Sequence, residues 1–230
     1  MVEGVRSVEE LLGSAVALRG VLTAPQLADA PRGRELIDRL AESTVEHSAL
    51  SEAEFRSAAE TESPQGVLAI AEIPDRRLSA LAGVTPLRLL VLDALQDPGN
   101  VGTILRTAAA LGADATVALP GTVDLWNAKV VRAAMGAHFH HQALHVSVDQ
   151  LFEFLDSESI PLWGADVNGT SVESVAVPAR LALAVGNEGA GLSSYLRERS
   201  SATISLPIAR STESLNVAVA TGILLYQLRK

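Results

Sequence analysis

The chain has 230 residues, of which 48% are apolar and 3% aromatic, and it carries a formal net charge of −9 with no cysteine. The absence of cysteine excludes disulfides, thiolate catalysis and cysteine-based zinc sites. The acidic balance does not favour a nucleic-acid binder held by bulk electrostatics, although almost all the positive charge is arginine, which suits phosphate contacts. No apolar run is long enough to cross a bilayer and no signal-peptide pattern opens the chain, so we expect a cytoplasmic protein.

The first 82 residues are expected to alternate helices and strands. Ser7 followed by Glu10, and Ser51 followed by Glu54, are capping-box patterns that predict helix starts. Hydrophobic periodicity predicts, in chain order, a helix from residue 7, a strand at 20–23, a helix at 34–40, a helix at 51–59 and a strand at 66–71. This alternation predicts a small α/β sandwich.

A polar connection punctuated by Pro74, Gly83 and Pro86 marks a domain boundary, which divides the chain into residues 1–82 and 83–230. Beyond it, strands are expected at 88–92, at 116–119, up to 146, at 160–165, at 181–185 and around 204. Helices are expected at 100–112, 125–135, 150–155 and 193–199, and from 214 onward. The second domain is therefore predicted to be a mostly parallel sheet with helices on both faces.

A polar loop at residues 97–102 directly follows a buried strand and opens a helix. Asn100 is expected near the N-cap of that helix, where free backbone N–H groups could bind an anion or a polar ligand. Arg106 is expected to be only partly exposed and to need a partner. Taken alone, this segment favours a capping Asn and a helix-surface Arg in a salt bridge over a ligand site.

A glycine-rich loop, Gly186-Asn187-Glu188-Gly189-Ala190-Gly191, follows another buried strand. It is a poor dinucleotide fingerprint, because it comes late in the chain and no acidic residue ends a strand about twenty residues on. The loop allows a ligand to approach the backbone closely, and Glu188 is its only charge. By itself it could also be an ordinary glycine-rich turn.

A third segment, Leu206-Pro207-Ile208 and then residues 211–220, completes an ordered set with the first two. The set resembles the SpoU (TrmH-type) family of RNA ribose 2'-O-methyltransferases, within the SPOUT superfamily, over residues 87–230. The first eighty residues resemble the small substrate-binding module, related to a ribosomal-protein fold, that precedes the catalytic domain in many members. Residues 2–10 match the opening of that module.

This resemblance implies a trefoil knot in the catalytic domain, a homodimer with sites at its interface, and S-adenosylmethionine held largely by backbone, with no metal. The positions that match the family's motifs for catalysis are Asn100, Arg106, Glu188, Ser214 and Asn216. Those that match its cofactor pocket are Val185, Gly186, Ile204, Leu206, Pro207, Leu215 and Asn216.

The chemistry implied by the resemblance is the attack of a ribose 2'-hydroxyl on a sulfonium methyl, which needs positioning and loss of the hydroxyl proton. In related enzymes the counterpart of Arg106 is proposed as the base. A guanidinium stays protonated in proteins, so we expect Arg106 to orient the phosphate and the hydroxyl and to stabilise the developing alkoxide. Asn100 is expected to hold Arg106 or the ribose, while Glu188 and Asn216 shape the pocket.

Residues 132–141 contain Arg132 and the histidines His138, His140 and His141. A zinc site is disfavoured because no acidic or cysteine ligand lies nearby. The stretch resembles a family segment beside the substrate cleft, so contact of Arg132 and the imidazoles with RNA is favoured. Simple packing of Phe139 among surface histidines is about equally plausible. Trp126 and Trp163 are expected in the core.

The predicted function is S-adenosylmethionine-dependent 2'-O-methylation of RNA, with 23S ribosomal RNA as the favoured target because of the accessory module. A tRNA methyltransferase and an antibiotic-resistance ribosomal RNA methyltransferase of the same family are alternatives. From other classes, a non-catalytic RNA-binding module and a Rossmann-type oxidoreductase stay open. Family members often begin with a basic segment ahead of the position at which this chain starts.

Overall fold

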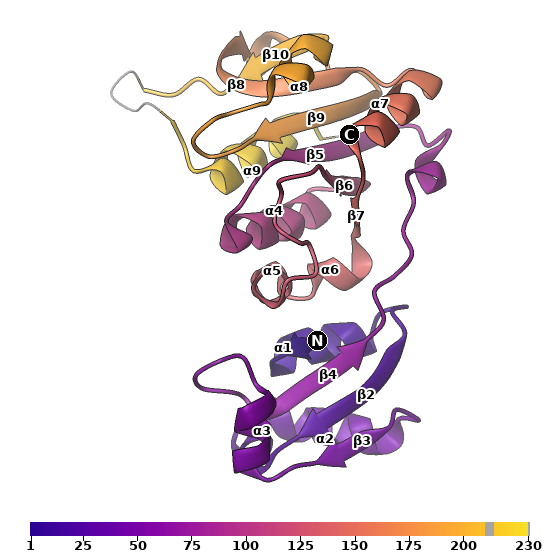
Figure 1. Cartoon of the computed structure of the whole chain (residues 1–230), viewed down its shortest axis with the longest axis vertical. Coiled ribbons are helices and arrows are strands. Elements are labelled where there is room, and N and C mark those ends of the chain that lie inside the picture. The colour runs from indigo at the N-terminus through magenta and orange to yellow at the C-terminus, as the bar shows by residue number, and fades with distance from the viewer. Residues whose placement is uncertain (210–213, 230) are drawn as a thin grey trace. The chain divides into compact units, whose positions relative to one another are not determined.

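The computed structural model describes residues 1–209 and 214–229, and the chain forms two compact units (Figure 1). The first unit comprises residues 1–75 together with 135–140, and the second comprises residues 76–134 and the chain from His141 onward. Within the described ranges, no helix is long and apolar enough to cross a membrane.

The first unit contains a four-stranded sheet in the order β1-β4-β2-β3, in which only β2 and β3 are parallel. Its strands are β1 (Val2–Glu3), β2 (Leu18–Thr23), β3 (His47–Ala49) and β4 (Val67–Ala71), and its helices are α1 (Val5–Leu12), α2 (Pro31–Glu42) and α3 (Glu52–Ala58). This is the expected small α/β arrangement. The sequence did not reveal β1 and β3, because strands of two and three residues show no periodicity.

The two capping boxes differ in outcome. Ser51 accepts a hydrogen bond from the Glu54 amide, and the Glu54 carboxylate binds Ser51 in return, which lowers the pKa of Glu54. The prediction for Ser7 was wrong, because α1 already begins at Val5 and Ser7 is buried inside it. The Val5 amide is satisfied by the Gln65 side chain at 2.9 Å, so no capping side chain is needed there.

The second unit is built on a sheet in which every strand pair is parallel, in the order β10-β8-β9-β5-β6-β7. Its strands are β5 (Leu87–Asp93), β6 (Ala115–Ala118), β7 (Gln142–His145), β8 (Leu162–Ser171), β9 (Arg180–Gly186) and β10 (Ala202–Ser205). Its helices are α4 (Pro98–Ala110), α5 (Ala128–Ala134), α7 (Val148–Ser157), α8 (Ser194–Arg199) and α9 (Val217–Gln227), while α6 (Ala137–His140) falls in the first unit.

Two apolar clusters cover the two faces of this sheet, as predicted. Along β5, Leu90 and Leu92 belong to one cluster, whereas Leu89 and Val91 belong to the other. The first cluster includes residues of α4, α5 and α9, and the second includes residues of α7 and α8. Because β5 is covered on both sides, it is apolar almost throughout rather than alternating.

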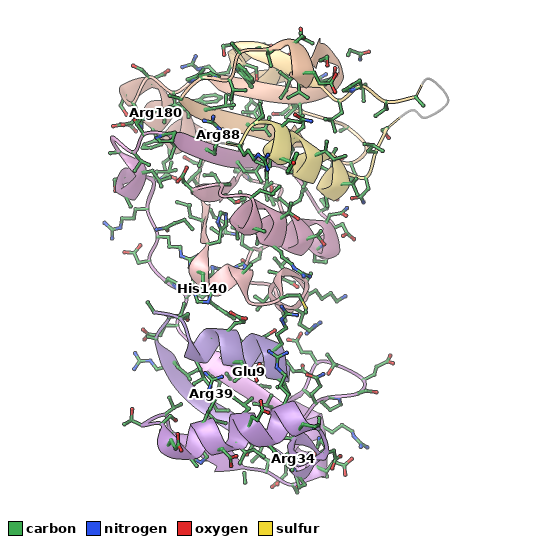
Figure 2. All side chains as sticks on the ribbon, turned by 180° about the vertical axis from the view of Figure 1, so that it is seen from behind. Glu9, Arg34, Arg39, Arg88, His140 and Arg180 are labelled. Atoms are coloured by element: carbon green, nitrogen blue, oxygen red, sulfur yellow. The ribbon has the colours of Figure 1, made fainter. Side chains whose placement is uncertain are left out.

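Arg88 is the exception in β5, and it connects the start of the strand to the end of the last helix (Figure 2). Its side chain is 7% exposed and donates to the carbonyl oxygens of Leu228 at 2.5 Å, and of Leu87 and Ala179 at 2.9 Å each. Burial lowers the pKa of Arg88, partly offset by Asp114. The three carbonyls make it possible to bury this cation.

Two of the clustered histidines lie inside the protein. His138 is 0% and His141 is 5% exposed, so the expectation that the imidazoles contact RNA is wrong for both, and the alternative of surface histidines fails for them as well. His140 is exposed. Trp163 is buried and Trp126 is half-buried against the core, as expected.

The buried His141 predicts a pH-dependent stability. Its Nε2 lies 2.8 Å from the Thr116 hydroxyl, and burial, with a smaller contribution from Arg76, lowers its pKa from 6.5 to about 4, against the opposing charge of Asp114. Between these values the unfolded chain binds a proton that the folded protein excludes. The stability contributed by neutral His141 should therefore be fully present above pH 6.5. The free energy of unfolding should fall by up to about 3 kcal/mol as the pH drops to 4.

Urea denaturation at pH 7 and pH 5 tests this. The His141→Gln variant should lose less stability between the two pH values than the wild type, whereas His47→Gln, at an exposed position, should keep the wild-type difference. An unchanged difference in His141→Gln would contradict the assignment.

Candidate functional site

The candidate site lies where β5, β9 and β10 end and their following loops meet. One cavity of about 530 Å³ opens there. Of the predicted site residues it is lined by Val185, Gly186, Glu188, Ile204, Leu206, Ser214, Leu215 and Asn216. Segments more than a hundred residues apart in the sequence thus contribute to one place, as Asn100 shows by its hydrogen bonds to this set.

Three of the predicted residues form a continuous chain of hydrogen bonds. The Asn216 amide donates to Asn100 Oδ1 at 3.0 Å, and the Asn100 amide donates to Glu188 Oε1 at 3.1 Å. The Asn216 oxygen also accepts from the backbone N–H groups of Ala218 and Val219. Because each amide has one accepting and one donating end, this chain determines the orientation of both Asn side chains.

The helix caps differ from the prediction. Asp97, and not Asn100, caps α4. The Asp97 side chain accepts a hydrogen bond from the backbone N–H of Asn100 at 2.6 Å, and Pro98 occupies the first turn. An internal carboxylate therefore occupies the place where an external anion was expected. Asn216 caps α9 instead, while Asn100 is half-buried and turns its side chain to Glu188.

Arg106 is exposed, so the prediction that it would be only partly exposed was wrong. In the part of the chain that the structure describes, it makes no hydrogen bond or ion pair. Thr103, one turn earlier in α4, is also exposed, so the two side chains lie on the same side of the helix. Its guanidinium is accessible to a ligand from solvent.

Two further predictions concern residues that are not seen to line the cavity. Pro207 is exposed and is not among the residues lining the cavity. Residues 211–213, which completed the third motif, lie outside the described residues.

The glycine loop approaches the next segment of chain too closely for any side chain at Gly186. A Cβ there would lie 2.2 Å from the Gly191 carbonyl carbon and 2.3 Å from the Leu192 nitrogen, both backbone atoms. Gly186 thus lets residues 187–191 fold back on the end of β9 and form one wall of the cavity.

Another wall comes from a bulge in β8 that sequence periodicity did not reveal. Thr203 pairs with Gly164 and the next residue, Ile204, pairs with Thr170, so residues 165–169 of β8 have no counterpart in β10. Ala165, Asp166 and Val167 of this bulge line the cavity. A bulge has no hydrophobic signature, so Asp166 could not be recognised as a site residue.

The comparison with protein families decides the identity of the second unit. Residues 88–226 match the SpoU rRNA Methylase family. The chain belongs to the SpoU methylase family. Residues 1–69 match the MRM3-like substrate binding domain. The resemblance inferred from the three motifs is thereby confirmed, and the assignment as a methyltransferase is favoured over the Rossmann-type oxidoreductase.

Curated relatives have named activities. The chain is 36% identical to the 23S rRNA (guanosine(2553)-2'-O)-methyltransferase RlmP of Bacillus subtilis, over 100% of this chain and 88% of that protein. It is 29% identical to the 23S rRNA (guanosine-2'-O-)-methyltransferase RlmB of Coxiella burnetii, over 99% and 94%.

Solved structures share the fold. The SpoU methyltransferase AviRb from Streptomyces viridochromogenes, in complex with AdoMet, superposes with a TM-score of 0.88 at 29% identity, over 98% of this chain and 87% of that one. A TrmH-family RNA methyltransferase structure from Porphyromonas gingivalis gives 0.82 at 29% identity, over 99% and 88%. The predicted α/β architecture, with a mostly parallel sheet between helices, is confirmed.

The tight contact at Gly186 yields a stability prediction with an internal control. Gly186→Ala should lower the free energy of unfolding by about 2 kcal/mol or more, since its Cβ would collide with backbone that cannot rotate away. Gly189→Ala, in the same loop, has its nearest atom at 3.7 Å and should change stability by less than about 1 kcal/mol. Chemical denaturation of both variants measures this. Equal effects would show that Gly186 is not a point of close approach.

Proposed function

We propose that this SpoU-family protein transfers a methyl group from S-adenosylmethionine to a ribose 2'-hydroxyl of 23S ribosomal RNA. The observation that carries the proposal is the cavity lined by the second and third motif segments, whose Glu188 and Asn216 are hydrogen-bonded to Asn100 of the first. The relatives named above, over nearly the full length of this chain, act on 23S rRNA by their names. The same target would place the enzyme in the cytoplasm.

The residues of the cavity fit S-adenosylmethionine. Its volume of about 530 Å³ is in the range of small-molecule sites, roughly 300–1,000 Å³. Val185, Ile204 and Leu206 offer an apolar wall for an adenine ring, and Gly186 permits close approach of the backbone. The cofactor supplies an activated methyl group on a sulfonium sulfur when bound. Pro207, exposed and outside the lining, is proposed to act only by shaping the loop after β10.

The protein's own contribution is positioning and electrostatics. With the cofactor bound, transfer would join the methyl carbon to the ribose oxygen, leave the sulfur as a thioether and pass the hydroxyl proton to solvent water, so this chain's residues would have to place the hydroxyl and stabilise negative charge on its oxygen. Asn100, oriented by Glu188 and Asn216, would hold the ribose, and the exposed Arg106 would bind the adjacent phosphate and stabilise the developing negative charge on oxygen. Ser214, which lines the cavity, would contact the substrate or cofactor at its rim.

The first unit is proposed as the RNA-binding module, with residues 1–82 serving substrate capture and 83–230 catalysis. Its surface carries arginines at the exposed face of α2, including Arg34 and Arg39 (Figure 2). Arginine binds phosphate bidentately, so these side chains can contact an RNA backbone despite the overall acidic charge. His140 and Arg132 are further candidates for RNA contact.

A homodimer is proposed from the last helix. Although α9 contains no charged residue, it leaves Val219 52%, Ile223 40% and Tyr226 49% exposed. An apolar helix of this kind is normally covered on all sides. Leu215, 36% exposed, continues this face into the cavity lining, so a second copy seated here would lie beside the site. The trefoil knot implied by the family stays a prediction.

The role proposed for Arg106 predicts a selective catalytic defect. Arg106→Ala and Arg106→Lys should each reduce single-turnover methyl transfer to 23S rRNA by about 100-fold, since a lysine cannot reproduce the planar fork. Equilibrium binding of S-adenosylmethionine should change by less than about twofold, because Arg106 does not line the cavity.

Arg197→Ala, at an exposed arginine of α8, is the matched control and should leave the rate unchanged. A full rate in Arg106→Lys would refute the proposed role. Mapping ribose methylation on the product RNA, with tRNA as a competing substrate, separates the ribosomal target from a tRNA target. A complete lack of methyl incorporation by the wild type would favour the non-catalytic RNA-binding module.

The dimer proposal predicts the effect of one charge on α9. Ile223→Glu should weaken self-association by at least about tenfold, because the carboxylate would be buried without a partner. Sedimentation equilibrium measures this, and Ile70→Glu, which changes a 50% exposed isoleucine of β4, is the control and should leave the dimer intact. A wild-type monomer at all concentrations would refute the dimer.

A further inference from the structure

The side chain of Asn187 joins the glycine loop to the end of the central strand, and no role was expected for it. We infer that Asn187 is a positioning residue: it holds residues 187–191 against β5, so that the cavity wall and Glu188 are in place for cofactor and substrate. The inference deepens the proposed function and rests on it for the identity of the cofactor.

Both ends of the Asn187 amide are used. Its Nδ2 donates to the carbonyl oxygen of Ala94 at 2.8 Å, and its Oδ1 accepts from the backbone N–H groups of Gly189 at 2.9 Å and Ala190 at 3.0 Å. The Asn187 backbone also exchanges two hydrogen bonds with Gly191, at 3.0 and 2.9 Å. The side-chain oxygen of Asn187 therefore closes the loop on itself, and its side-chain nitrogen attaches the loop to the turn after β5.

The point of attachment is itself unusual. Ala94 follows the last residue of β5 and has a φ of 57°, a left-handed conformation that costs a non-glycine residue about 1 kcal/mol or more. This conformation sets the direction of the chain toward Asp97, which caps α4. A hydrogen bond to the Ala94 carbonyl helps to hold that turn.

The consequence is a fixed distance between two motif residues. Glu188 follows Asn187 directly, and Asn100 lies in the first turn of the helix that the Ala94 turn introduces. The two side chains meet in a hydrogen bond of 3.1 Å. Asn187 thus links the two backbone segments on which the Asn100–Glu188 contact depends, without lying in that contact.

Aspartate at this position gives a diagnostic variant. A carboxylate could still accept from the Gly189 and Ala190 amides, but it would face the Ala94 carbonyl with a negative charge instead of a donor. The segments that Asn187 joins carry acidic groups, namely Glu188 on the same loop, Asp93 at the end of β5 and Asp97, which caps α4, and the Tyr195 hydroxyl donates to Asp93. As the pH falls toward the ordinary aspartate pKa of about 3.9, a growing fraction of this carboxyl gains an O–H that replaces the lost donor, and the loop should be restored to that extent.

The experiment measures S-adenosylmethionine affinity by calorimetry at pH 8 and pH 5.5 for the wild type, Asn187→Asp and Asn127→Asp. Asn127 is an exposed asparagine that uses only its oxygen, toward the Lys129 amide, so its variant is the matched control. At pH 8 the Kd of Asn187→Asp should be about ten- to a hundredfold that of the wild type, and the ratio should fall severalfold at pH 5.5 as part of the carboxyl becomes protonated. Asn127→Asp should give a ratio near one at both pH values.

Amide hydrogen exchange separates this inference from the proposed function. In the wild type without cofactor, the Gly189 and Ala190 amides should exchange at least about tenfold slower than an unstructured chain, and Asn187→Asp should remove that protection at pH 8. If the wild type does not bind S-adenosylmethionine, the proposed function fails while the exchange result still decides the role of Asn187. Unprotected Gly189 and Ala190 amides in the wild type, or a Kd ratio that does not change with pH, would overturn the inference. The exchange rates of these amides in the wild type can overturn it even if the variant does not fold.

Discussion

The site depends on the register between two parallel strands. Asp93, the last residue of β5, pairs with Gly186, the last residue of β9, so both strands end at the same edge of the sheet. Each strand is buried on both faces, so a slip of one residue would exchange the apolar side chains between the two clusters that cover the sheet. The packing of the core therefore determines that the loops after residues 93 and 186 begin side by side.

Small residues allow the loops at this edge to form the walls of a cavity. Gly186 allows the loop after β9 to turn back at backbone contact distance. On the other side, a Cβ at Gly169 would lie 2.6 Å from the Ile204 carbonyl carbon, so the bulged part of β8 can pass close to β10 only because this residue has no side chain. The resulting walls combine loop backbone with the apolar residues Val185, Ile204 and Leu206, as is usual for a small-molecule pocket.

Polar side chains then hold the loops to one another. Asn216 caps α9 and binds Asn100, Asn100 binds Glu188, and Asn187 binds the turn after β5. Each of these amides satisfies backbone or side-chain groups from a segment distant in the sequence. Arg106 takes no part in this network and stays accessible, as suits a group that would meet a phosphate on a bound RNA.

The sequence alone determined the α/β class, the order of the main helices and strands, and, through three separated motifs, the family of the second unit. Those features follow from local periodicity, glycine and proline positions and residue types, all of which are written along the chain. It did not reveal that Asp97 rather than Asn100 caps α4, that Ser7 lies inside α1, or that Arg106 is exposed. Nor did it reveal that His138 and His141 are buried, or that Asp166 and Asn187 belong to the site. Tertiary structure decided these points. Each depends on which segments pack together: burial, a bulge between strands that are not adjacent in the sequence, and hydrogen bonds across about ninety residues. The pattern of a single sequence does not record the distance between such segments.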